Sequence, residues 1–503
     1  MVKKSVSEQS GVLNPPKGGA IVRMYRIGHG DCFLIAFAGK KKPVHVLIDC
    51  GYKPKSPSYI KSTPDQVVAN IREVTGGKID VAVITHEHQD HLNAITKTRF
   101  AGFEIGQIWY GWTEDKDDKL AQQLRISKGR KLKQLKAARL QLAVGDMAQF
   151  VDQVLELELG GESENFNGLA LAAGGGGASN KGAMNFLESL CQSEPECLFP
   201  HQRIVELPGA EHVRVYPLGP PHSDEGIRDL EPENDENFRQ LAATGLPRSS
   251  FALADSPESS SGGSPFAARY CERLGGATTD ANLDGWFNLY YGQTGTGGLA
   301  EEAVEIPSNA AFRRIDGDWL QGAGELAIAL GDFTNNSSLV LAFELGEGGK
   351  VLLFAGDAQR GNWVSWAAQP FKDGKSEVDV KELLSRTVLY KCGHHGSHNA
   401  TLKGNTGSQL PSLGWLGNGK YSKEFTAMIT AVRAWALTQR PPWDHPLKSI
   451  KSALVEKADG RVLQTDTDFD QLEKPEAASA ASWKAFQDRA AGNDLFFDLR
   501  IDP

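Results

Sequence analysis

Residues 81–95 of this 503-residue chain have the sequence VAVITHEHQDHLNAI, and this stretch decides the fold that we expect. The run VAVIT is almost uniformly apolar, which is typical of a strand buried on both faces. It leads directly into four side chains that can bind metals, at His86, His88, Asp90 and His91. In open α/β sheets, ligands bind at the carboxyl ends of strands. Imidazole and carboxylate groups there suit zinc, manganese or iron.

The spacing within this cluster predicts how the ions would be shared. His86 and His88 are two residues apart, so in an extended chain they point to the same side and can share one ion. Asp90 and His91 follow at the predicted start of a helix and can hold a second ion. The alternative is a polar loop of surface histidines. With 12 histidines in 503 residues, however, such clustering is improbable by chance.

Two later segments offer the remaining groups that a two-metal site needs. FAGDA at 354–358 ends the apolar run KVLLFAGD, so Asp357 follows a strand and could bridge two ions. Taken alone, Asp357 could equally be a turn residue. CGHHGSH at 392–398 follows the predicted strand TVLYKC and offers His394 or His395 as the last imidazole. The sequence does not choose between these two histidines.

HEHQDH at 86–91 resembles the HxHxDH motif of the metallo-β-lactamase superfamily, whose fold is an αββα sandwich of two sheets between helices. The motif order is closer still to one branch, the hydrolase domain attached to the DNA-uptake channel ComEC and its stand-alone relatives. The other motifs that carry this resemblance are GHGDCFLI (28–35), VLIDCG (46–51), NNSSLVL (335–341), LLFAGDA (352–358) and KCGHHGSH (391–398). His445-Pro446, SIKSALVEK and GRVLQTD resemble the closing segment of that domain. The resemblance covers roughly residues 20–110, 212–222 and 330–470.

The resemblance implies two divalent ions, zinc or manganese, and roles for particular residues. The implied ligands are His86, His88, Asp90, His91, Asp357 and one of His394 and His395. Asp90 and His91 would also be catalytic, with Asp90 orienting the nucleophile. Asp49 would orient a ligand imidazole from behind, although it could equally be a turn residue after its strand. Gly28, Gly30 and Asp31 would form a tight loop near the site.

One stretch departs from the wider superfamily, which places a third histidine ahead of the strand that leads to the bridging aspartate. Here that stretch is Thr334-Asn335-Asn336-Ser337. The first metal could therefore lack an imidazole, accept a weak oxygen from Asn335 or Asn336, or be exchangeable. Four further histidines could substitute, although we expect each to be an ordinary surface or loop residue: His201, His212, His222 and His445.

The rest of the chain predicts a layered α/β core with large insertions. Three short apolar runs between 20 and 51 predict a strand meander, and TPDQVVANIREVTGG (63–77) has helical spacing and a Gly-Gly stop. Alternating strands and helices indicate an α/β layered core. The expected parts are a flexible tail at 1–19, a hydrolase domain at 20–222 and 330–503, a charged helical insertion at about 112–211 and a Gly/Ser-rich insertion at 223–329.

A basic segment, KGRKLKQLKAARLQLA (128–143), lies within the predicted helical part of the first insertion. Leu132, Leu135 and Leu142 could form a buried stripe beneath its bases. Lys131, Lys133 and Lys136 then have two interpretations. They are either a solvated helix face or a phosphate-binding arm beside the active site.

Composition excludes several classes of protein. A net charge of −9 argues against a protein that coats nucleic acid by bulk electrostatics, but not against an enzyme that grips a few phosphates. Six scattered cysteines suggest neither a disulfide framework nor a zinc knuckle. The first residues lack a secretory apolar region, and no apolar run approaches the roughly 18 residues of a membrane helix. We therefore expect a cytoplasmic protein without membrane contacts.

The leading functional hypothesis is hydrolysis of a phosphodiester in nucleic acid or a nucleotide. Two ions lower the pKa of a water between them, and the resulting hydroxide can attack phosphorus or carbonyl carbon. One alternative is hydrolysis of a small ester, lactone or lactam, which needs no basic patch. Another is a weakly active scaffold whose insertions bind partner proteins, an alternative that the missing third histidine leaves open.

Overall fold

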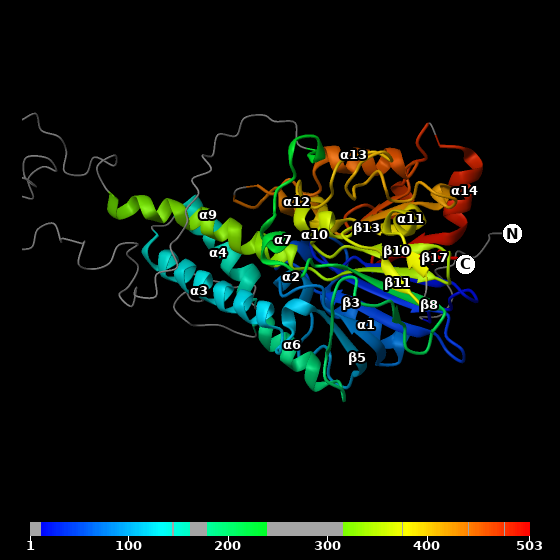
Figure 1. The fold of residues 1–503 in the computed structure, drawn as a ribbon, viewed down its shortest axis with the longest axis horizontal. Coiled ribbons are helices and arrows are strands. Elements are labelled where there is room, and N and C mark those ends of the chain that lie inside the picture. The colour runs from blue at the N-terminus through cyan, green and yellow to red at the C-terminus, as the bar shows by residue number, and fades with distance from the viewer. Residues whose placement is uncertain are drawn as a thin grey trace, which may run out of the picture.

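The computed structural model describes residues 12–142, 145–160, 179–238, 315–374, 376–440, 442–476 and 478–503. Most of them build two β-sheets that pack face to face, with helices against both outer faces (Figure 1). The predicted α/β class is therefore confirmed. Most of the predicted tail, the Gly-rich stretch of the first insertion and most of the second insertion lie outside the described residues.

The first sheet joins the two ends of the described chain. Its strands are β1 (Ala20–Tyr25), β2 (Cys32–Phe37), β3 (Val44–Cys50), β4 (Lys78–Val83), β5 (Glu104–Gly111), β6 (Glu196–Leu198), β16 (Ala490–Gly492) and β17 (Phe496–Ile501). Their spatial order is β16-β17-β1-β2-β3-β4-β5-β6. Pairing is antiparallel from β16 to β3 and parallel from β3 to β6. The C-terminal strand β17 thus completes the sheet that the predicted N-terminal meander begins.

The second sheet has the same division into an antiparallel and a parallel half. Its strands are β7 (Val205–Glu206), β8 (Val213–Gly219), β9 (Val340–Leu345), β10 (Val351–Phe354), β13 (Thr387–Lys391), β14 (Thr426–Ile429) and β15 (Val462–Gln464). Their order is β15-β14-β13-β10-β9-β8-β7, antiparallel from β7 to β10 and parallel from β10 to β15. Strands β9 and β10 pair antiparallel and form a hairpin around a Gly-rich turn. A small separate ribbon pairs β11 (Phe371–Asp373) with β12 (Ser376–Val378).

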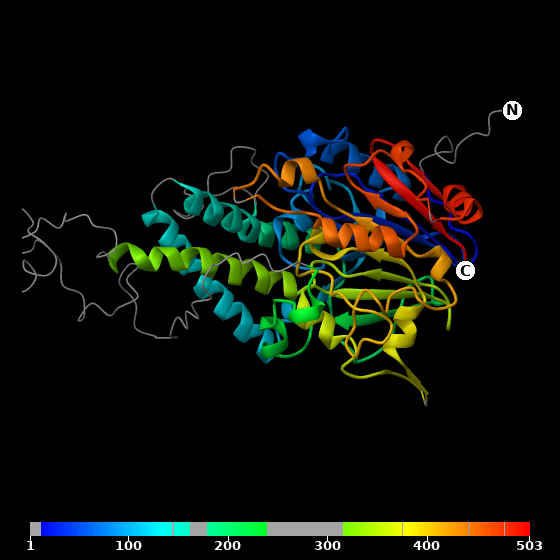
Figure 2. The ribbon, with the colours of Figure 1, turned by 90° about the horizontal axis from the view of Figure 1, so that it is seen from above.

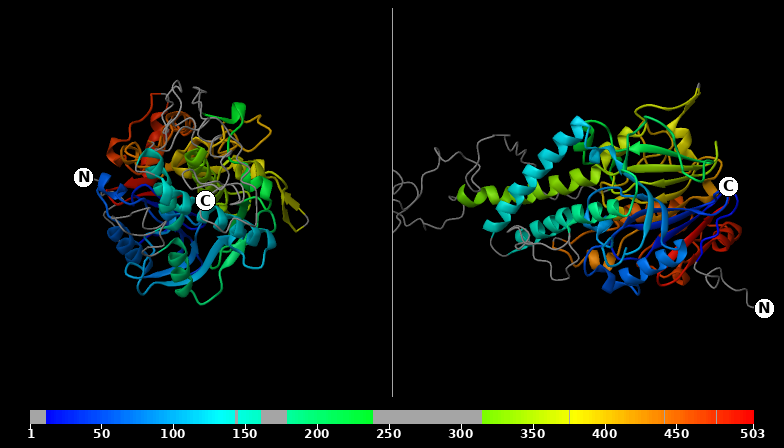
Figure 3. Two further views of the ribbon diagram at one scale, coloured as in Figure 1. Left: turned by 90° about the vertical axis from the view of Figure 1, so that its left-hand side faces the viewer. Right: turned by 90° about the horizontal axis from the view of Figure 1, so that it is seen from below.

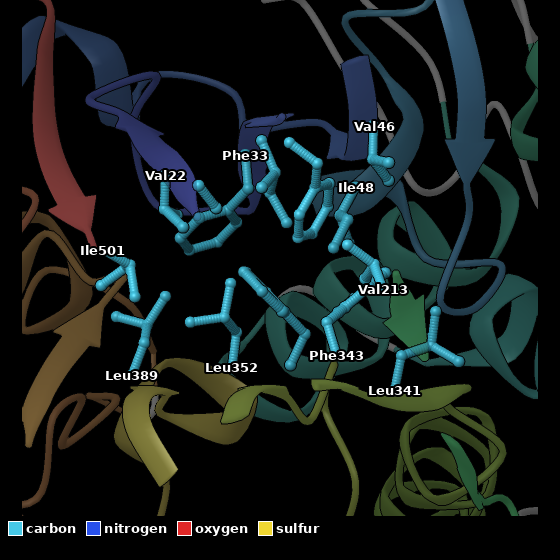
Figure 4. Close-up of a cluster of buried hydrophobic side chains, with 14 of the residues drawn as sticks. Val22, Phe33, Val46, Ile48, Val213, Leu341, Phe343, Leu352, Leu389 and Ile501 are labelled. Carbon is cyan, nitrogen blue, oxygen red and sulfur yellow. The ribbon is translucent and has the colours of Figure 1, made fainter. Parts of the chain in front are cut away.

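The main core lies between the two sheets, where side chains from both inner faces interdigitate (Figure 4). Strand β2 shows why its sequence, CFLIAF, is apolar throughout. Successive side chains of a strand point to opposite faces. Phe33 therefore packs against the other sheet, close to Phe354 and Leu352, while Leu34 packs outward against the covering helices. A strand buried on both faces needs no polar side.

The covering helices fill the outer faces. Helices α1 (Pro64–Thr75) and α6 (Asn180–Ser189) cover the first sheet, and α10 (Arg360–Ser365), α11 (Val380–Ser385) and α13 (Lys448–Lys457) cover the second. Helix α1 begins where its sequence predicts, because Thr63 and Gln66 form a capping box ahead of a buried apolar stripe. Gly76 ends it in the left-handed conformation.

Short elements complete the body. The remaining short α-helices are α2 (Gln89–Leu92), α7 (Asp224–Arg228), α12 (Arg433–Ala436) and α14 (Ala480–Arg489). The 3₁₀ turns are η2 (Ser56–Tyr59), η3 (Trp112–Glu114), η4 (Asn234–Glu236), η7 (Gly393–Gly396), η8 (Ser422–Glu424) and η9 (Phe469–Gln471). Of these, α2 contains the predicted ligands Asp90 and His91, and η7 contains His394 and His395.

Three longer helices, α3 (Lys119–Gln141), α4 (Asp146–Leu159) and α9 (Ile315–Asn336), project together from one end of the sandwich (Figures 1, 2 and 3). We call them the arm. Leu135 of α3, Leu155 of α4 and Leu330 of α9 share a small core of their own. Leu135 is buried, and Leu132 and Leu142 are partly buried against the same core, which confirms the predicted apolar stripe.

The structure places two features across the predicted domain boundaries. Strands β6 and β7 lie within the predicted insertion at 112–211, yet they extend the two sheets. Helix α9 runs through the predicted boundary at 329/330 and belongs to the arm at its beginning and to the predicted site at its end. The arm is therefore assembled from both predicted insertions.

Candidate metal centre

The carboxyl ends of parallel strands from both sheets meet at the end of the sandwich from which the arm projects (Figure 1). In the first sheet, Asp49 lies at the end of β3, and β4 leads through Thr85 to His86. In the second sheet, Asp357 follows β10 and Lys391 ends β13. The chain topology thus brings segments more than 300 residues apart to one point, as in the His395–Asp90 contact.

The HEHQDH segment forms an extended stretch followed by the single turn of α2, with His88 at its N-cap. His86, His88, Asp90 and His91 are all buried. The Nε2 atom of His86 lies 3.0 Å from Nδ1 of His88, so the two rings face a common point. This is the arrangement that two imidazoles sharing one ion require.

On the side of the sandwich, hydrogen bonds fix the orientation of two rings. Asp49 Oδ2 accepts from His91 Nδ1 at 2.7 Å and from the Thr85 hydroxyl at 2.6 Å. The Thr85 oxygen is then free to accept from His86 Nδ1, 3.1 Å away. Each ring nitrogen that faces away from the centre is therefore a donor, which leaves the lone pair of the other nitrogen pointing inward.

The other two rings are held in the same way by acceptors farther out. His395 Nδ1 donates to the Thr430 carbonyl oxygen at 3.0 Å, so its Nε2 faces Asp90 Oδ2 at 3.1 Å. His88 Nε2 lies 2.9 Å from Glu158 Oε1, so its Nδ1 faces His86. In their neutral form, the four buried imidazoles consequently direct unprotonated nitrogens toward one region.

The ligand atoms form two overlapping groups. His86, His91 and Asp357 make one group, and Asp31, His91 and His395 make another, with all atoms of each group within 4.8 Å of one another. Asp357 Oδ2 lies 3.3 Å from His91 Nε2 and 3.6 Å from His395 Nε2. Because Asp357 also groups with His86, it lies between a ring predicted to bind one ion and the rings predicted to bind the other, where a bridging carboxylate is expected.

Several buried polar atoms here lack a hydrogen-bond partner within the described part of the chain. They include Asp90 Oδ1, His91 Nε2, Asn335 Oδ1 and His394 Nδ1. A buried acceptor without a partner costs free energy, about 1–3 kcal/mol, and such atoms in a native site call for an explanation. A bound cation would satisfy Asp90 Oδ1, so the residues present fit a metal.

The charges of the buried side chains also fit a bound metal. Four carboxylates of the centre are buried: Asp31, Asp49, Asp90 and Asp357. Lys391 Nζ contacts two of them, at 2.5 Å from Asp31 Oδ2 and 3.3 Å from Asp357 Oδ1. Burial alone would lower the pKa of Lys391, but the charges of Asp31 and Asp357 raise it above its ordinary value. One ammonium against four carboxylates leaves negative charge that divalent cations would neutralise.

The pKa values of His91 and Asp90 reflect the electrostatic interactions within this cluster. Burial alone would lower the pKa of His91, but Asp357 and Asp49 raise it well above its ordinary value. Burial also opposes ionisation of Asp90, yet His395 and His91 hold the pKa of Asp90 well below its ordinary range. In both cases the buried carboxylates favour a positive charge beside them. A metal ion supplies that charge without the need to protonate a histidine.

The structure separates the two histidines between which the sequence could not choose. Both have left-handed backbones inside η7, with φ of 40° at His394 and 51° at His395. Such conformations cost non-glycine residues about 1–3 kcal/mol each and cluster at functional sites. They turn His395 toward Asp90 and Asp357, while His394 Nε2 lies 3.2 Å from Asn335 Nδ2.

The two asparagines that replace the missing histidine also differ. Asn336 donates to the carbonyl oxygens of Gly226, Ile227 and Asp229, and its own carbonyl accepts from the backbone amides of Gln359 and Asn362. Asn336 is therefore fully engaged in holding loops together. The buried Asn335 oxygen has no hydrogen-bond partner in the described ranges, and the side chain faces His394, so Asn335 is the asparagine that could contribute a weak ligand.

None of the four substitute histidines belongs to the two ligand groups found among the described residues. His201 contacts the Ser365 carbonyl, and His222 contacts Asp118 near the start of α3. His212 precedes β8. His445 lies beside His394, with ring centroids 5.4 Å apart, and beside His29. Of the four, His445 alone lies next to a residue of the centre in these contacts.

Two residues of the centre were missed by the sequence prediction, Lys391 and Glu158. Lys391 and the ion pair of Asp31 were not predicted, although a lysine closing the apolar run TVLYK is unusual and could have been a signal. Glu158 was also missed. It ends α4 in DQVLELEL, and nothing in that local pattern distinguishes it from an ordinary exposed glutamate.

The predicted phosphate-binding lysines lie farther out along the arm. Lys128 of α3 contacts Glu158 at 3.0 Å and Glu87 at 3.3 Å, so this base is engaged at the centre. A helix rises about 1.5 Å per residue, which places Lys136 about 12 Å farther along α3. Lys131 and Lys133 lie between these two positions. The phosphate-binding role of Lys131, Lys133 and Lys136 stays a prediction.

A small cavity lies between the arm and the sandwich, beside Lys128. Its volume of about 30 Å³ suits a single water molecule. Its lining consists of Glu87, Thr113, Glu114, Leu124, Arg125, Lys128, Phe333, Thr334 and Ser337. Burial and the charge of Glu87 raise the pKa of Glu114 to about 7. A carboxyl that is partly protonated near neutral pH thus lies next to the arm–sandwich contact.

Comparison with known proteins does not assign the chain to a family: no protein-family model matches it, and no curated protein does. Among the described residues, no helix combines the length and apolar character needed to cross a membrane.

Proposed function

We propose that this chain is a metal-dependent hydrolase of the metallo-β-lactamase superfamily that cleaves phosphodiester bonds in nucleic acid or a nucleotide. The observation that carries the proposal is the convergence of four imidazoles, each with its outer nitrogen held by an acceptor, on buried carboxylates with an unsatisfied oxygen. Two facing sheets between helices, with the site at their carboxyl ends, agree with the fold that the motifs imply.

The geometry suggests how the residues would divide two divalent ions, zinc or manganese. His86 and His88 would hold one ion, with Asn335 as a weak additional ligand. Asp90, His91 and His395 would hold the other, and Asp357 would lie between them. Such ions supply a water of lowered pKa and neutralise charge that develops on the substrate.

The protein's own groups have further roles in this proposal. Asp90 Oδ1, which has no hydrogen-bond partner among the described residues, would orient the attacking water or accept its proton. Lys391 contacts Asp31 and Asp357 and offsets part of the repulsion between these buried carboxylates. Asp49 keeps Nε2 of His91 directed at the centre.

Fewer observations support the proposed substrate class. The resemblance to the ComEC-type domain favours a phosphodiester, and the arm presents a basic helix. Because Lys128 is already engaged with Glu158, the site itself offers little free positive charge from that helix. This observation favours a second candidate, hydrolysis of a small ester, lactone or lactam, for which no basic patch is needed.

The test is cleavage of labelled single- and double-stranded DNA, a nucleotide diester and a small aryl ester, each with Mn²⁺, Mg²⁺ or Zn²⁺. We expect cleavage of a diester that depends on metal and that falls to background in Asp90→Ala/His91→Ala. A matched control is Asp118→Asn/His222→Ala, which removes an Asp–His contact of 3.0 Å outside the centre and keeps a capping residue on α3.

The outcomes separate the candidates. Cleavage that survives in Asp90→Ala/His91→Ala would contradict the proposed centre. Ester cleavage without diester cleavage would move the assignment to the second candidate. A wild-type protein that holds no metal and cleaves nothing would leave the scaffold alternative.

A further inference from the structure

The centre receives one of its supports from the arm rather than from the sandwich. His88 and Glu158 are both enclosed, with side chains 1% and 0% exposed, and His88 Nε2 lies 2.9 Å from Glu158 Oε1. Glu158 is the penultimate residue of α4. A carboxylate at this distance accepts the Nε2 proton and fixes the tautomer in which Nδ1 carries the lone pair.

Each helix of the arm contributes one group to this contact. Glu158 comes from α4, Lys128 Nζ of α3 lies 3.0 Å from Glu158 Oε2, and the Thr334 hydroxyl of α9 donates to the same oxygen at 3.2 Å. Burial alone would raise the pKa of Glu158, but Lys128 and His88 lower it to about 2. Both carboxylate oxygens are therefore engaged, one by the metal-facing histidine and one by the arm.

The arm is also fastened to the histidine loop through the backbone. The Asn180 amide of α6 donates to the Glu87 carbonyl at 3.0 Å and to the Leu157 carbonyl at 2.8 Å. Glu87 stands between His86 and His88, and Leu157 precedes Glu158. One side chain thus fixes the distance between the loop that holds the imidazoles and the helix that holds the carboxylate.

We infer that the arm completes the metal centre, with Glu158 as a positioning residue that holds His88 with Nδ1 toward the ion and Lys128 as the cation that keeps Glu158 in place. The inference rests on the proposed function for the presence of a metal. It goes beyond that function because it makes metal affinity depend on helices outside the sandwich. Partners of metal-bound imidazoles typically change metal affinity about 10- to 100-fold.

The experiment measures metal affinity of the full chain by competition between the protein and a fluorescent chelator for Zn²⁺ and Mn²⁺. Glu158→Ala should weaken binding about 10- to 100-fold, and Glu158→Gln, which can still accept a hydrogen bond, should weaken it less. The matched control is Asp152→Asn, on the same helix, which breaks the α3–α4 ion pair with Arg139 and touches no ligand. Its affinity should equal that of the wild type.

A second measurement uses metal-free protein labelled with ¹⁵N at histidine. In the wild type the His88 signals should report a proton on Nε2, and in Glu158→Ala a mixture of both tautomers. A purely structural role for Glu158 would not change this signature. Because Glu158→Ala leaves Lys128 without its closest partner and could unfold the arm, Lys128→Met/Glu158→Leu serves as a neutral pair without an acceptor, in which we expect the same loss of fixation.

The outcomes distinguish this inference from the proposed function. A wild type that binds neither metal would overturn the proposed function. A wild type that binds metal, together with Glu158→Ala of equal affinity and unchanged His88 tautomer, would overturn the inference and leave the function standing. Loss of affinity in Asp152→Asn as well would show that arm folding, not Glu158, is what matters, and would also overturn the assignment.

Discussion

Two carboxylate–imidazole pairs support the centre from opposite sides, and they are built in different ways. Asp49 ends a strand inside the first sheet and contacts His91 at 2.7 Å. Glu158 lies at the end of an arm helix and contacts His88 at 2.9 Å. Asp49 is fixed by the pairing of β3 with both β2 and β4, and its Oδ1 accepts from the Thr85 amide at 2.8 Å. Glu158 depends on Lys128, Thr334 and the small core of the arm.

This difference in construction predicts how far the effect of a substitution should spread through the protein. The strands around Asp49 belong to the main core between the sheets, so a change there is felt by the whole fold. The arm has its own core of a few aliphatic residues, including Leu135 and Leu330, and can respond locally. The sandwich side should therefore control folding and metal binding together, while the arm side should control metal binding with less effect on global stability.

The largest expected effect comes from the buried lysine on the sandwich side. Lys391→Met removes the ammonium between Asp31 and Asp357, whose side chains are 3% and 2% exposed. Breaking a buried pair in this way costs about 3–5 kcal/mol. We expect such a loss in urea unfolding with a chelator present, and a smaller loss with saturating Zn²⁺, because the ion replaces the missing charge.

The matched variant on the arm is Lys128→Met. Lys128 also contacts two carboxylates, but its side chain is 15% exposed and that of Glu87 is 24% exposed. The loss of global stability should therefore be clearly smaller than for Lys391→Met. Equal losses in the two variants would remove the distinction between sandwich and arm.

Asp49→Asn gives the next effect and sharpens the comparison with Glu158→Gln. Asp49 accepts from His91, the Thr85 hydroxyl and the Thr85 amide, and an amide nitrogen cannot accept where Oδ2 now accepts two of these bonds. We expect metal affinity to fall about 10- to 100-fold and stability to fall by about 1–3 kcal/mol. Chelator competition and urea unfolding on the same samples measure both. If the variant kept full stability and lost only metal affinity, Asp49 would act like Glu158, as a residue that affects metal binding without supporting the fold.

The two sides also differ in how far the sequence predicts them. HEHQDH, Asp49 and Asp357 each follow an apolar strand, and strands that run parallel end at a common edge, so their convergence follows from local patterns. Glu158 follows no strand. Its position depends on packing between α3, α4 and α9, and no short-range pattern contains that information.

Helix α9 shows the same limit within a single element. Its sequence contains Gly322, Gly324 and Gly331, and a glycine costs a helix about 1 kcal/mol relative to alanine. The pattern therefore did not predict a helix before Asn335. Packing of Ala323, Ala327 and Leu330 into the arm core overrides this weak propensity. The turn of His395, rather than His394, toward Asp90 and Asp357 is likewise set by two left-handed residues that the sequence does not indicate.

The smallest expected effect concerns whether the arm contacts substrate as well as metal ligands. If Lys133 and Lys136 bind phosphates, Lys133→Glu/Lys136→Glu should weaken DNA binding and reduce the slope of log K against log salt by about 0.9 for each lost phosphate contact on duplex DNA. The matched control is Lys40→Glu/Lys42→Glu. Both lysines lie in the loop between β2 and β3, which precedes the amino end of β3 and so lies at the other end of that strand from the metal centre. Binding is measured by titration over a range of salt concentrations. A slope reduced only by the arm variant would extend the arm's role from holding His88 to holding substrate. Equal slopes in both variants would confine the arm to the metal centre, and these lysines would then be a solvated helix face.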